Sequence, residues 1–488
     1  MSELLKKSIS ELRSDLDSKA ISSEELAIAS LAAVDKHKDL NCFISTNPEQ
    51  IIADAKSADA LIAKGEKRPL LGIPIAIKDL ILTKTEPTTA GSKILKGFQS
   101  PYEATVAIKL REAGAILFGK TNQDEFGMGT SNENSPYGSV KNPWDLTRVP
   151  GGSSGGSAVS VAARITPAAL GTDTGGSCRQ PGALCGIVGY KPTYGRNSRY
   201  GVIAFASSLD QVGIFTHNIK DLALVAEAIA GHDKRDSTSV DLEVPSHSQY
   251  FGKEVKGLRI GVPKEYFIAG VDPEVASAVR AAIDKLSELG AEIVDISLPN
   301  TEVGVATYYI LAPAEASSNL ARYDGIRYGH RAEGTNGLFD LYCKTRSEGF
   351  GEEVKRRIII GTYVLSSGYY DAYYLKAQRV RKLIQQDFDN AFKDKCDVIA
   401  CPTAPTTAFK LNDKSMDTLA LYLQDAMTIP TSLAGLPGVS IPCGFDSKNL
   451  PIGLQLIGQA WKEPEMLHIA DAYQSATDWH KQLAPIVN

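Results

Sequence analysis

A segment rich in glycine and serine, residues 132–213, constrains this chain more than any other part of its sequence. It keeps apolar stretches at residues 158–163 and 187–190, which a flexible linker or a low-complexity region would lack. Glycine tolerates backbone conformations that other residues avoid and lets another group approach the main chain closely. The segment therefore predicts a site that is built largely from backbone groups inside a folded core.

Length and composition are those of an ordinary globular protein. The chain has 488 residues, of which 43% are hydrophobic and 22% are charged. At about 150 residues per domain, the length alone allows roughly three domains. The 52 basic and 57 acidic residues leave a net charge of −5, which provides no general attraction to nucleic acid or anionic lipid. Disorder, direct RNA binding and membrane binding are therefore not expected.

The sequence carries no clear signal for membrane insertion, export or metal binding. Its apolar runs end well before the ~20 residues of a membrane helix, and its first residues resemble neither a signal peptide nor a transit peptide. The seven cysteines are scattered and include no C-x-x-C pair, which indicates reduced thiols and no zinc site. We expect a cytoplasmic protein that binds no metal.

The order of the predicted elements indicates an α/β fold. Capping-box patterns that begin at Ser8 and Ser22 predict helices in an N-terminal layer, residues 1–60. Alternating isoleucines predict a buried strand within residues 72–79, which delivers Lys78. The other expected elements are helix 106–112, strand 115–118, strand 258–262, a helix at 273–289, strand 292–296, a mainly helical region 301–395 and strand 398–401. Together they predict a mixed sheet flanked by helices.

Two short motifs suggest functions that their surroundings do not support. Residues 114–121 fit the P-loop pattern G-x-x-x-x-G-K-T, but apolar residues occupy the loop positions and indicate a strand. Residues 151–155 fit the G-x-S-x-G elbow of serine hydrolases, yet two prolines within residues 142–150 exclude the central strand that must precede the elbow. The seven histidines lie in no catalytic pattern, so we expect neither a base nor a metal ligand among them.

Lys78 and the run of residues 171–177 offer the groups that acyl transfer needs. A serine among glycines can be exposed as a nucleophile, and Ser177 ends this run. A lysine can be the base if it is neutral, and burial lowers its pKa from the usual value of about 10.4. Asp79 should not oppose this, because adjacent residues of a strand point to opposite faces. The backbone N–H groups predicted to hold the oxyanion are those of Thr174, Gly175, Gly176 and Ser177.

Three stretches resemble the amidase signature family, whose members hydrolyse amides with a Ser-cisSer-Lys triad. They are residues 72–79, 150–157 and 171–181. The resemblance implies Ser177 as the nucleophile and Lys78 as the base. Between them it places Ser153 as a proton bridge, which follows Gly152 through a cis peptide bond.

The resemblance also implies the fold: one large α/β domain over residues 1–488, with a central mixed sheet flanked by helices on both sides. Within this domain we expect an N-terminal layer at 1–60, a catalytic core at 61–232, a surface connection at 233–257 and a second part of the core at 258–488, which includes the helical region 301–395.

Four further stretches are similar to the glutamine-hydrolysing members of this family that serve bacterial tRNA-dependent amidotransferases. They are residues 124–129 together with 133–135, 198–211, 313–324 and 348–357. Such a protein releases ammonia from glutamine and passes it to a partner B subunit. The B subunit uses ATP and Mg²⁺ to convert Glu-tRNA(Gln) to Gln-tRNA(Gln), or Asp-tRNA(Asn) to Asn-tRNA(Asn), and a small C subunit completes a heterotrimer. The resemblance thus implies no cofactor in this chain and tRNA contact mainly through the B subunit.

Free glutamine offers two charged groups for recognition. A glutaminase should present a cation to the α-carboxylate and a carboxylate to the α-ammonium. The resemblance suggests Arg357 and Asp425 for these roles, with Tyr308 and Gly129 also in the substrate site. It favours Arg357 over its neighbour Arg356.

Three alternatives remain open from the sequence. The first is a free-standing amidase that uses the same triad on a different small amide. The second is an ATP-binding protein that uses residues 114–121. The third is an inactive structural component of a complex, against which the intact Lys78, Ser153 and Ser177 argue.

Overall fold

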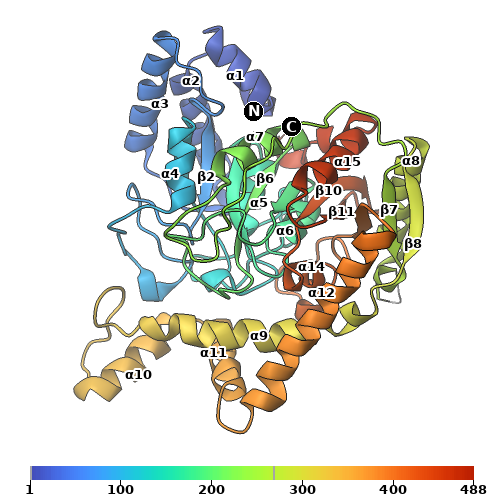
Figure 1. Ribbon diagram of the computed structural model, residues 1–488. Coiled ribbons are helices and arrows are strands. Elements are labelled where there is room, and N and C mark those ends of the chain that lie inside the picture. The colour runs from blue at the N-terminus through green and yellow to red at the C-terminus, as the bar shows by residue number, and fades with distance from the viewer. Residues whose placement is uncertain (1–2, 268–269, 488) are drawn as a thin grey trace.

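Strands from distant parts of the chain form one mixed β-sheet in the computed structural model, which describes residues 3–267 and 270–487 (Figure 1). Within these residues the sheet has 11 strands in the order β1-β3-β2-β4-β6-β5-β10-β11-β9-β7-β8. The strands are β1 (Phe43–Ser45), β2 (Pro74–Lys78), β3 (Ile116–Thr121), β4 (Ala168–Asp173), β5 (Val188–Lys191), β6 (Gln211–Thr216), β7 (Arg259–Pro263), β8 (Glu292–Ile296), β9 (Val398–Pro402), β10 (Gly438–Phe445) and β11 (Pro451–Gly458).

Helices cover the sheet, as the sequence predicts (Figure 1). Every residue of β2, β3, β4, β5 and β6 is buried, so both faces of this part of the sheet are covered. The α-helices are α1 (Ile9–Asp17), α2 (Ser23–Lys36), α3 (Pro48–Ala63), α4 (Thr105–Glu112), α5 (Gly155–Ala162), α6 (Arg179–Cys185), α7 (Ile219–Ile229), α8 (Pro273–Glu288), α9 (Gly304–Asn319), α10 (Gly337–Gly349), α11 (Glu352–Val364), α12 (Lys376–Asp394), α13 (Thr418–Leu423), α14 (Ile429–Leu433) and α15 (Glu463–Ser475).

Short helical turns join these elements. The turns are η1 (Glu3–Lys6), η2 (Lys38–Leu40), η3 (Lys93–Leu95), η4 (Glu125–Gly127), η5 (Lys264–Tyr266), η6 (Pro299–Val303), η7 (Leu320–Arg322), the π-helical η8 (Tyr370–Leu375), η9 (Trp479–Lys481) and η10 (Pro485–Val487). Both predicted capping boxes are confirmed: Ser8 and Ser22 each exchange hydrogen bonds with the glutamate three residues later.

Strand β2 lies inside the sheet, parallel to β3 on one side and to β4 on the other. The alternating isoleucines predict this strand, and the prediction is confirmed. Strands covered on both faces hold all of their side chains away from water. Lys78, the last residue of β2, therefore enters the core of the protein.

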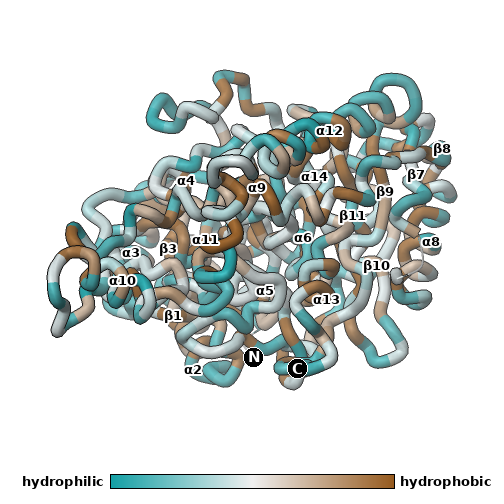
Figure 2. The backbone as a smooth tube through the Cα atoms, turned by 90° about the horizontal axis from the view of Figure 1, so that it is seen from below, coloured by the Kyte–Doolittle hydropathy of each residue, from teal (hydrophilic) through white to brown (hydrophobic). Residues whose placement is uncertain are grey.

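Apolar side chains pack on both faces of the sheet. In β9, Val398 and Ala400 belong to the larger cluster, whereas Ile399 and Cys401 belong to a second one. Since successive residues of a strand point to opposite faces, the two clusters lie on opposite sides of β9. Helix α12 packs on the second cluster and alternates between hydrophilic and hydrophobic segments (Figure 2).

The predicted apolar stripe of α12 is confirmed, since Ile384, Phe388 and Phe392 are buried and Val380 packs beside them. The P-loop look-alike is likewise a strand: β3 contains Lys120, whose buried amine donates to Thr88 Oγ1 at 2.8 Å. That lysine belongs to the core, as the strand interpretation of residues 114–121 predicts.

The sequence analysis does not predict several of the strands. β1 interrupts the predicted helical layer of residues 1–60 and pairs with β3. The β10–β11 hairpin carries prolines and glycines that obscure its alternation, and its pairing shifts between Pro442 and Gly444. Tertiary pairing overrides these local signals. In the described part of the chain, no helix is both long and apolar enough to span a membrane.

Candidate active site

Lys78 ends β2 with its amine surrounded by hydroxyl groups. Its Nζ donates to Ser153 Oγ at 2.8 Å, to Ser154 Oγ at 2.8 Å and to Thr172 Oγ1 at 2.9 Å. Burial lowers the pKa of Lys78 to about 8, and nearby acidic groups oppose this only in part. A lysine in this state can give up its proton close to neutral pH and then accept one from a hydroxyl group.

The carboxylate next to Lys78 in the sequence points elsewhere, as strand geometry predicts. Asp79 accepts hydrogen bonds from the N–H groups of Thr89 at 3.0 Å and Gly91 at 3.2 Å. Its other oxygen lies 3.7 Å from Lys120 Nζ. Asp79 is therefore engaged with a different lysine and leaves Lys78 without a carboxylate at hydrogen-bond distance among the described residues.

Ser153 follows Gly152 through a cis peptide bond, as the family resemblance implies. Two main-chain contacts hold this serine in place. The N–H of Gly152 donates to Gln180 Oε1 at 3.1 Å, and the carbonyl of Ser153 accepts from the N–H of Asp124 at 3.2 Å. The hydroxyl of Ser153 is thereby presented to Lys78.

Ser177 lies in the loop between β4 and α6, next to the segment that carries Ser153 and Ser154. Its carbonyl accepts a hydrogen bond from the N–H of Ser154 at 3.3 Å. Within the described residues, the hydroxyl of Ser177 makes no hydrogen bond with that of Ser153. Of the two hydrogen bonds that the predicted proton relay needs, the described residues thus form the one between Ser153 and Lys78 and not the one between Ser177 and Ser153. Catalytic hydrogen bonds often tighten only when substrate binds.

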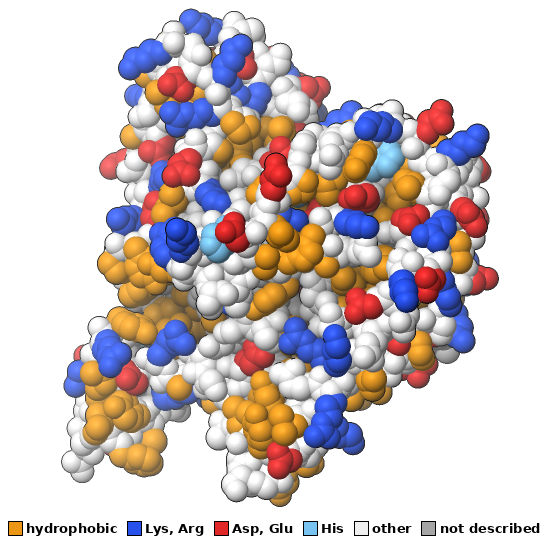
Figure 3. Space-filling model, in the orientation of Figure 1, with side chains coloured by type: hydrophobic (Ala, Val, Ile, Leu, Met, Phe, Trp, Pro, Cys, Tyr) orange, Lys and Arg blue, Asp and Glu red, His pale blue; other side chains and the backbone are white. Residues whose placement is uncertain are grey.

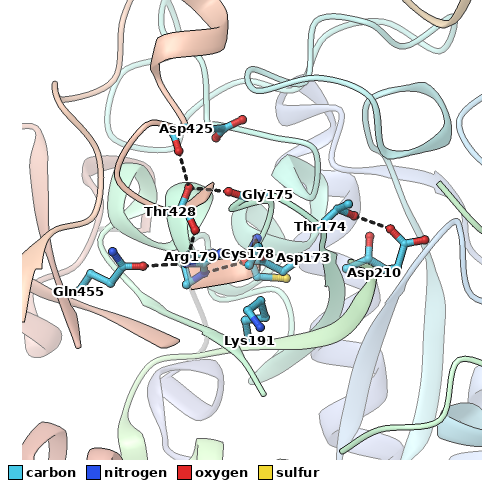
Figure 4. Close-up of polar contacts among 12 residues, drawn as sticks. Asp173, Thr174, Gly175, Cys178, Arg179, Lys191, Asp210, Asp425, Thr428 and Gln455 are labelled. Atoms are coloured by element: carbon cyan, nitrogen blue, oxygen red, sulfur yellow. Dashed lines mark hydrogen bonds and ion pairs between the residues drawn. The ribbon is translucent and has the colours of Figure 1, made fainter. Parts of the chain in front are cut away.

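A buried ion pair between Asp173 and Arg179 braces the loop that carries Ser177 (Figure 4). Arg179 Nε donates to Asp173 Oδ2 at 3.0 Å and Nη2 donates to Oδ1 at 2.9 Å. Burial raises the pKa of Asp173, but the Arg179 charge and hydrogen bonds outweigh it and hold that pKa below its usual value. The same carboxylate accepts from the N–H of Cys178 at 3.2 Å. The segment after Ser177 is therefore fixed from inside.

Arg179 and Thr174 connect this loop to other parts of the chain (Figure 4). Arg179 Nη1 donates to Gln455 Oε1 of β11 at 2.7 Å and to the carbonyl of Thr428 at 2.9 Å. Thr174 Oγ1 donates to Asp210 Oδ1 at 2.7 Å. Burial raises the pKa of Asp210 to about 6. Both ends of the predicted oxyanion segment are thus held by buried side chains.

The two glycines before Ser177 touch residues from the second half of the chain. A Cβ on Gly175 would come within 2.9 Å of Tyr308 Cζ. A Cβ on Gly176, where φ is +150°, would come within 2.8 Å of Thr428 Cβ. The hydroxyl of Thr428 also donates to the carbonyl of Gly175 at 2.7 Å. A side chain at Gly176 would overlap Thr428 in a backbone conformation that favours glycine, and a side chain at Gly175 would displace the Tyr308 ring.

Arg357 of α11 is buried, whereas the side chain of Arg356 is 48% exposed. Arg357 Nε donates to Glu353 Oε1 at 2.8 Å, and the guanidinium carbon lies 5.2 Å from the ring centre of Tyr309 and 5.5 Å from that of Tyr422. Its two terminal nitrogens make no hydrogen bond within the described residues. Glu353 thus holds Arg357 in place through Nε, while the two terminal nitrogens remain able to donate hydrogen bonds to a ligand.

Asp425 lies between α13 and α14, beside the oxyanion segment. Its Oδ1 is buried without a hydrogen-bond partner in the described part of the chain and would lie 3.3 Å from a Cβ on Gly176. Burial raises the pKa of Asp425 well above its usual value, Asp173 adds to this, and Arg357 opposes it. Tyr308 and Asp425 therefore lie against the two glycines before Ser177, and the charge of Arg357 acts on both of these side chains.

Gly129 lies further along the loop that follows η4, where a Cβ would overlap the carboxylate of Asp124. Asp124 in turn contacts the main chain of Ser153. Asp124 therefore lies between Gly129 and Ser153. A contact of Gly129 with substrate stays a prediction.

Several functional neighbours were missed from the sequence. Ser154 and Thr172 contact Lys78 directly, and Glu353 orients Arg357. Ser154 adjoins Ser153 in the same glycine-serine run, and this position could have indicated a role in the site. The sequence around Ser154 does not indicate that its hydroxyl contacts Lys78. Glu353 precedes Arg357 by four residues, a spacing at which helix side chains meet.

A family comparison decides what kind of protein this is. The family model described as Amidase matches residues 25–467, which is most of the chain. The chain belongs to the amidase signature family. The resemblance seen in the sequence is thereby confirmed, as is the expectation of an α/β amidase domain with a mixed sheet.

This amidase is similar over nearly its whole length to the A subunits of glutamyl-tRNA(Gln) amidotransferases. It is 55% identical to the one from Geobacter sp. (strain M21), over 99% of this chain and 100% of the relative. It is 56% identical to the one from Ralstonia nicotianae, over 96% and 97% of the two chains. The crystal structure of the Thermotoga maritima homologue, which has the same name, superposes with a TM-score of 0.79 at 40% identity and covers 96% of this chain and 94% of that chain.

The buried Asp173–Arg179 pair yields a stability prediction. Arg179→Met should lower the free energy of unfolding by about 3–5 kcal/mol, because it leaves the Asp173 carboxylate buried without its counter-charge. Equilibrium urea unfolding followed by circular dichroism measures this loss.

The matched control is Arg259→Met. Arg259 pairs with Asp397 at 2.9 Å, but the two side chains are 35% and 37% exposed. This variant should leave the unfolding midpoint nearly unchanged, since exposed ion pairs contribute little. Equal losses in the two variants would show that burial does not set the strength of the Asp173–Arg179 pair.

Proposed function

We propose that this chain is the glutaminase component, or A subunit, of a tRNA-dependent amidotransferase. The observation that carries the proposal is that a buried carboxylate, Asp425, lies beside Gly176 in the run that leads to Ser177, and that a buried guanidinium, Arg357, is close enough to act on its charge. Free glutamine presents an α-carboxylate and an α-ammonium, which such a pair can bind together. The names of the full-length relatives support the same assignment.

In the proposed reaction, Ser177 Oγ attacks the side-chain amide carbon of glutamine. The proton of Ser177 passes through Ser153 to the neutral amine of Lys78. Backbone N–H groups of residues 174–177 hold the oxyanion of the tetrahedral intermediate. Protonated Lys78 then returns a proton through Ser153 to the leaving nitrogen, so that ammonia departs and a γ-glutamyl ester forms on Ser177. Water attacks this ester, gives its proton to the same relay and releases glutamate.

The charge state of Asp425 supports an ammonium-binding role. Burial and the Asp173 charge raise the pKa of Asp425 although Arg357 and Arg179 oppose this, so a further cation at hydrogen-bond distance would favour the charged carboxylate. The α-ammonium of glutamine would supply that cation, while Arg357 takes the α-carboxylate with its free terminal nitrogens. Tyr308, packed on Gly175, would limit the space around the bound side chain.

We further propose that the ammonia passes to a B subunit, while a small C subunit completes the assembly. ATP, Mg²⁺ and the main tRNA contacts belong to the B subunit in this proposal, and the assembly works in the cytoplasm, where aminoacyl-tRNA is made. Exposed apolar side chains support assembly. They gather over the lower part of the molecule in Figure 3, where α10, α11 and the segment 369–375, which includes η8, carry Leu338, Phe339, Ile359, Tyr363, Tyr369, Tyr370 and Tyr373.

The first test is ammonia release from glutamine, with the purified chain alone and with co-expressed B and C subunits, misacylated tRNA and ATP. Ser177→Ala should lower the rate on the order of 10⁴-fold or more, because no other group can form the ester, while glutamine binding measured by calorimetry persists. Strong dependence on the assembly supports the proposal. Fast turnover of other small amides by the chain alone, without gain from partners, would identify a free-standing amidase.

The pH dependence follows from Lys78. The base must be neutral, and burial lowers its pKa to about 8. Glutaminase kcat/KM should therefore rise with pH, about tenfold per unit below this pKa, and level off above it. A profile that is flat or falls between about pH 6.5 and 9.5 would contradict the assignment of Lys78 as the base.

Arg357 and Arg356 form a matched pair for testing substrate recognition. Arg357→Ala should raise KM for glutamine on the order of 10²-fold with a smaller change in kcat, because it removes a buried partner of the α-carboxylate. Arg356→Ala, at an exposed position one residue away, should leave both constants near their original values. Equal effects of the two variants, or a loss confined to kcat, would exclude Arg357 as the carboxylate-binding group.

A further inference from the structure

We propose that a second cavity, remote from Ser177, binds a small carboxylate that also carries a hydrogen-bond donor, such as an amino acid or a hydroxy acid. The cavity has a volume of about 550 Å³ and lies where the start of α1, the start of α7 and the end of α15 meet, in the upper part of Figure 1. Lys78, Ser153 and Ser177 do not line it. Its volume falls in the usual range of ligand pockets, about 300–1,000 Å³.

Buried polar atoms without partners mark this cavity as a site. Four of its lining residues are at least nine-tenths buried: Arg164 and His217 are each 7% exposed, Gln474 is 6% exposed and Asp221 is 1% exposed. Each has one buried atom without a hydrogen-bond partner in the described part of the chain, namely Arg164 Nε, His217 Nε2, Gln474 Nε2 and Asp221 Oδ1. Native proteins leave few such atoms unpaired, and here they belong to four residues that line one cavity.

The two buried charges of the cavity, Arg164 and Asp221, form no ion pair with each other or with another described residue. Arg164 Nη1 donates to the carbonyl of Lys6 at 2.9 Å, and Arg164 makes no ion pair with a carboxylate of the described residues. Burial lowers the pKa of Arg164 to about 10, although Asp221 opposes this. Burial raises the pKa of Asp221 to about 6, despite hydrogen bonds from the N–H of Ile9 and from Asn218 Nδ2. Arg164 thus has no anion at ion-pair distance, and Oδ1 of Asp221 has no hydrogen-bond donor, among the described residues.

These unmet requirements define the ligand chemistry. Arg164 Nε and Gln474 Nε2 are donors, which suit the oxygens of a carboxylate. Asp221 Oδ1 is an acceptor, which suits an ammonium or a hydroxyl group on the same ligand. Neutral His217 can donate or accept. A simple anion such as acetate or chloride would satisfy the donors and leave Asp221 Oδ1 without a partner, so the cavity favours a ligand with both kinds of group.

Isothermal titration calorimetry tests the proposal with L-malate and L-glutamate as probes and with acetate and inorganic phosphate as comparisons. Wild-type protein should bind L-malate or L-glutamate more tightly than acetate or phosphate. Arg164→Gln and Asp221→Asn should each weaken this binding at least tenfold. Arg357→Ala, which alters the proposed glutamine site, should leave the binding of L-malate unchanged and remove only the part of L-glutamate binding that belongs to the glutamine site, and this separates the two sites.

Arg164 is buried, so its variant needs a check of folding by circular dichroism and a second variant at the surface. Lys220 lines the same cavity, is exposed and has no ion pair in the described residues, so Lys220→Ala should weaken binding two- to threefold at low salt. The matched control is Lys234→Ala, another exposed lysine, which does not line the cavity and should change nothing.

Three outcomes would overturn the proposal. The first is that no probe binds except through Arg357, which would mean a cavity filled by water alone. The second is equal affinity in wild type and in folded Arg164→Gln. The third is that acetate or phosphate binds as tightly as L-malate, because the donor requirement set by Asp221 would then be wrong.

Discussion

The burial of the Lys78 amine is the constraint on which the rest of the site depends. Water strongly favours a charged ammonium, so a buried lysine whose described hydrogen-bond partners are three hydroxyl groups is held close to the point where it loses its proton. Such burial needs a strand that is covered on both faces, and β2 meets this need because it lies between β3 and β4. The position of β2 inside the sheet therefore sets the lowered pKa of the proposed catalytic base.

The buried pair of Asp173 and Arg179 has a different role, because it fixes the loop before α6 in place. Backbone donors stabilise an oxyanion only if they do not have to reorganise during the reaction. Arg179 ties this loop to β11 through Gln455 and to the segment before α14 through Thr428. Residues more than 200 positions apart thus meet at the nucleophile, and the site depends on both halves of the chain.

Much of the site could be predicted, but for different reasons in different places. Strand alternation placed Lys78 in the core and turned Asp79 away from it, because both effects depend on adjacent residues. The family resemblance supplied Ser153, Arg357 and Asp425, which local patterns could not single out. Ser154 and Thr172 were missed, since nothing in their own surroundings in the sequence indicates that they meet the amine of Lys78. The β10–β11 hairpin was missed because its prolines and glycines hide its pattern.

By itself, the sequence determined the local conformations and the chemical groups that are available: the capped helices of the N-terminal layer, the buried strand that ends in Lys78 and the glycines before Ser177. These features depend on residues within a few positions of one another. Only the tertiary structure decided that Arg357 is buried while Arg356 is exposed, that Asp425 lies beside Gly176, and that Arg164 and Asp221 share a cavity without pairing. Burial and pairing of this kind arise from the packing of distant segments, which no local pattern encodes.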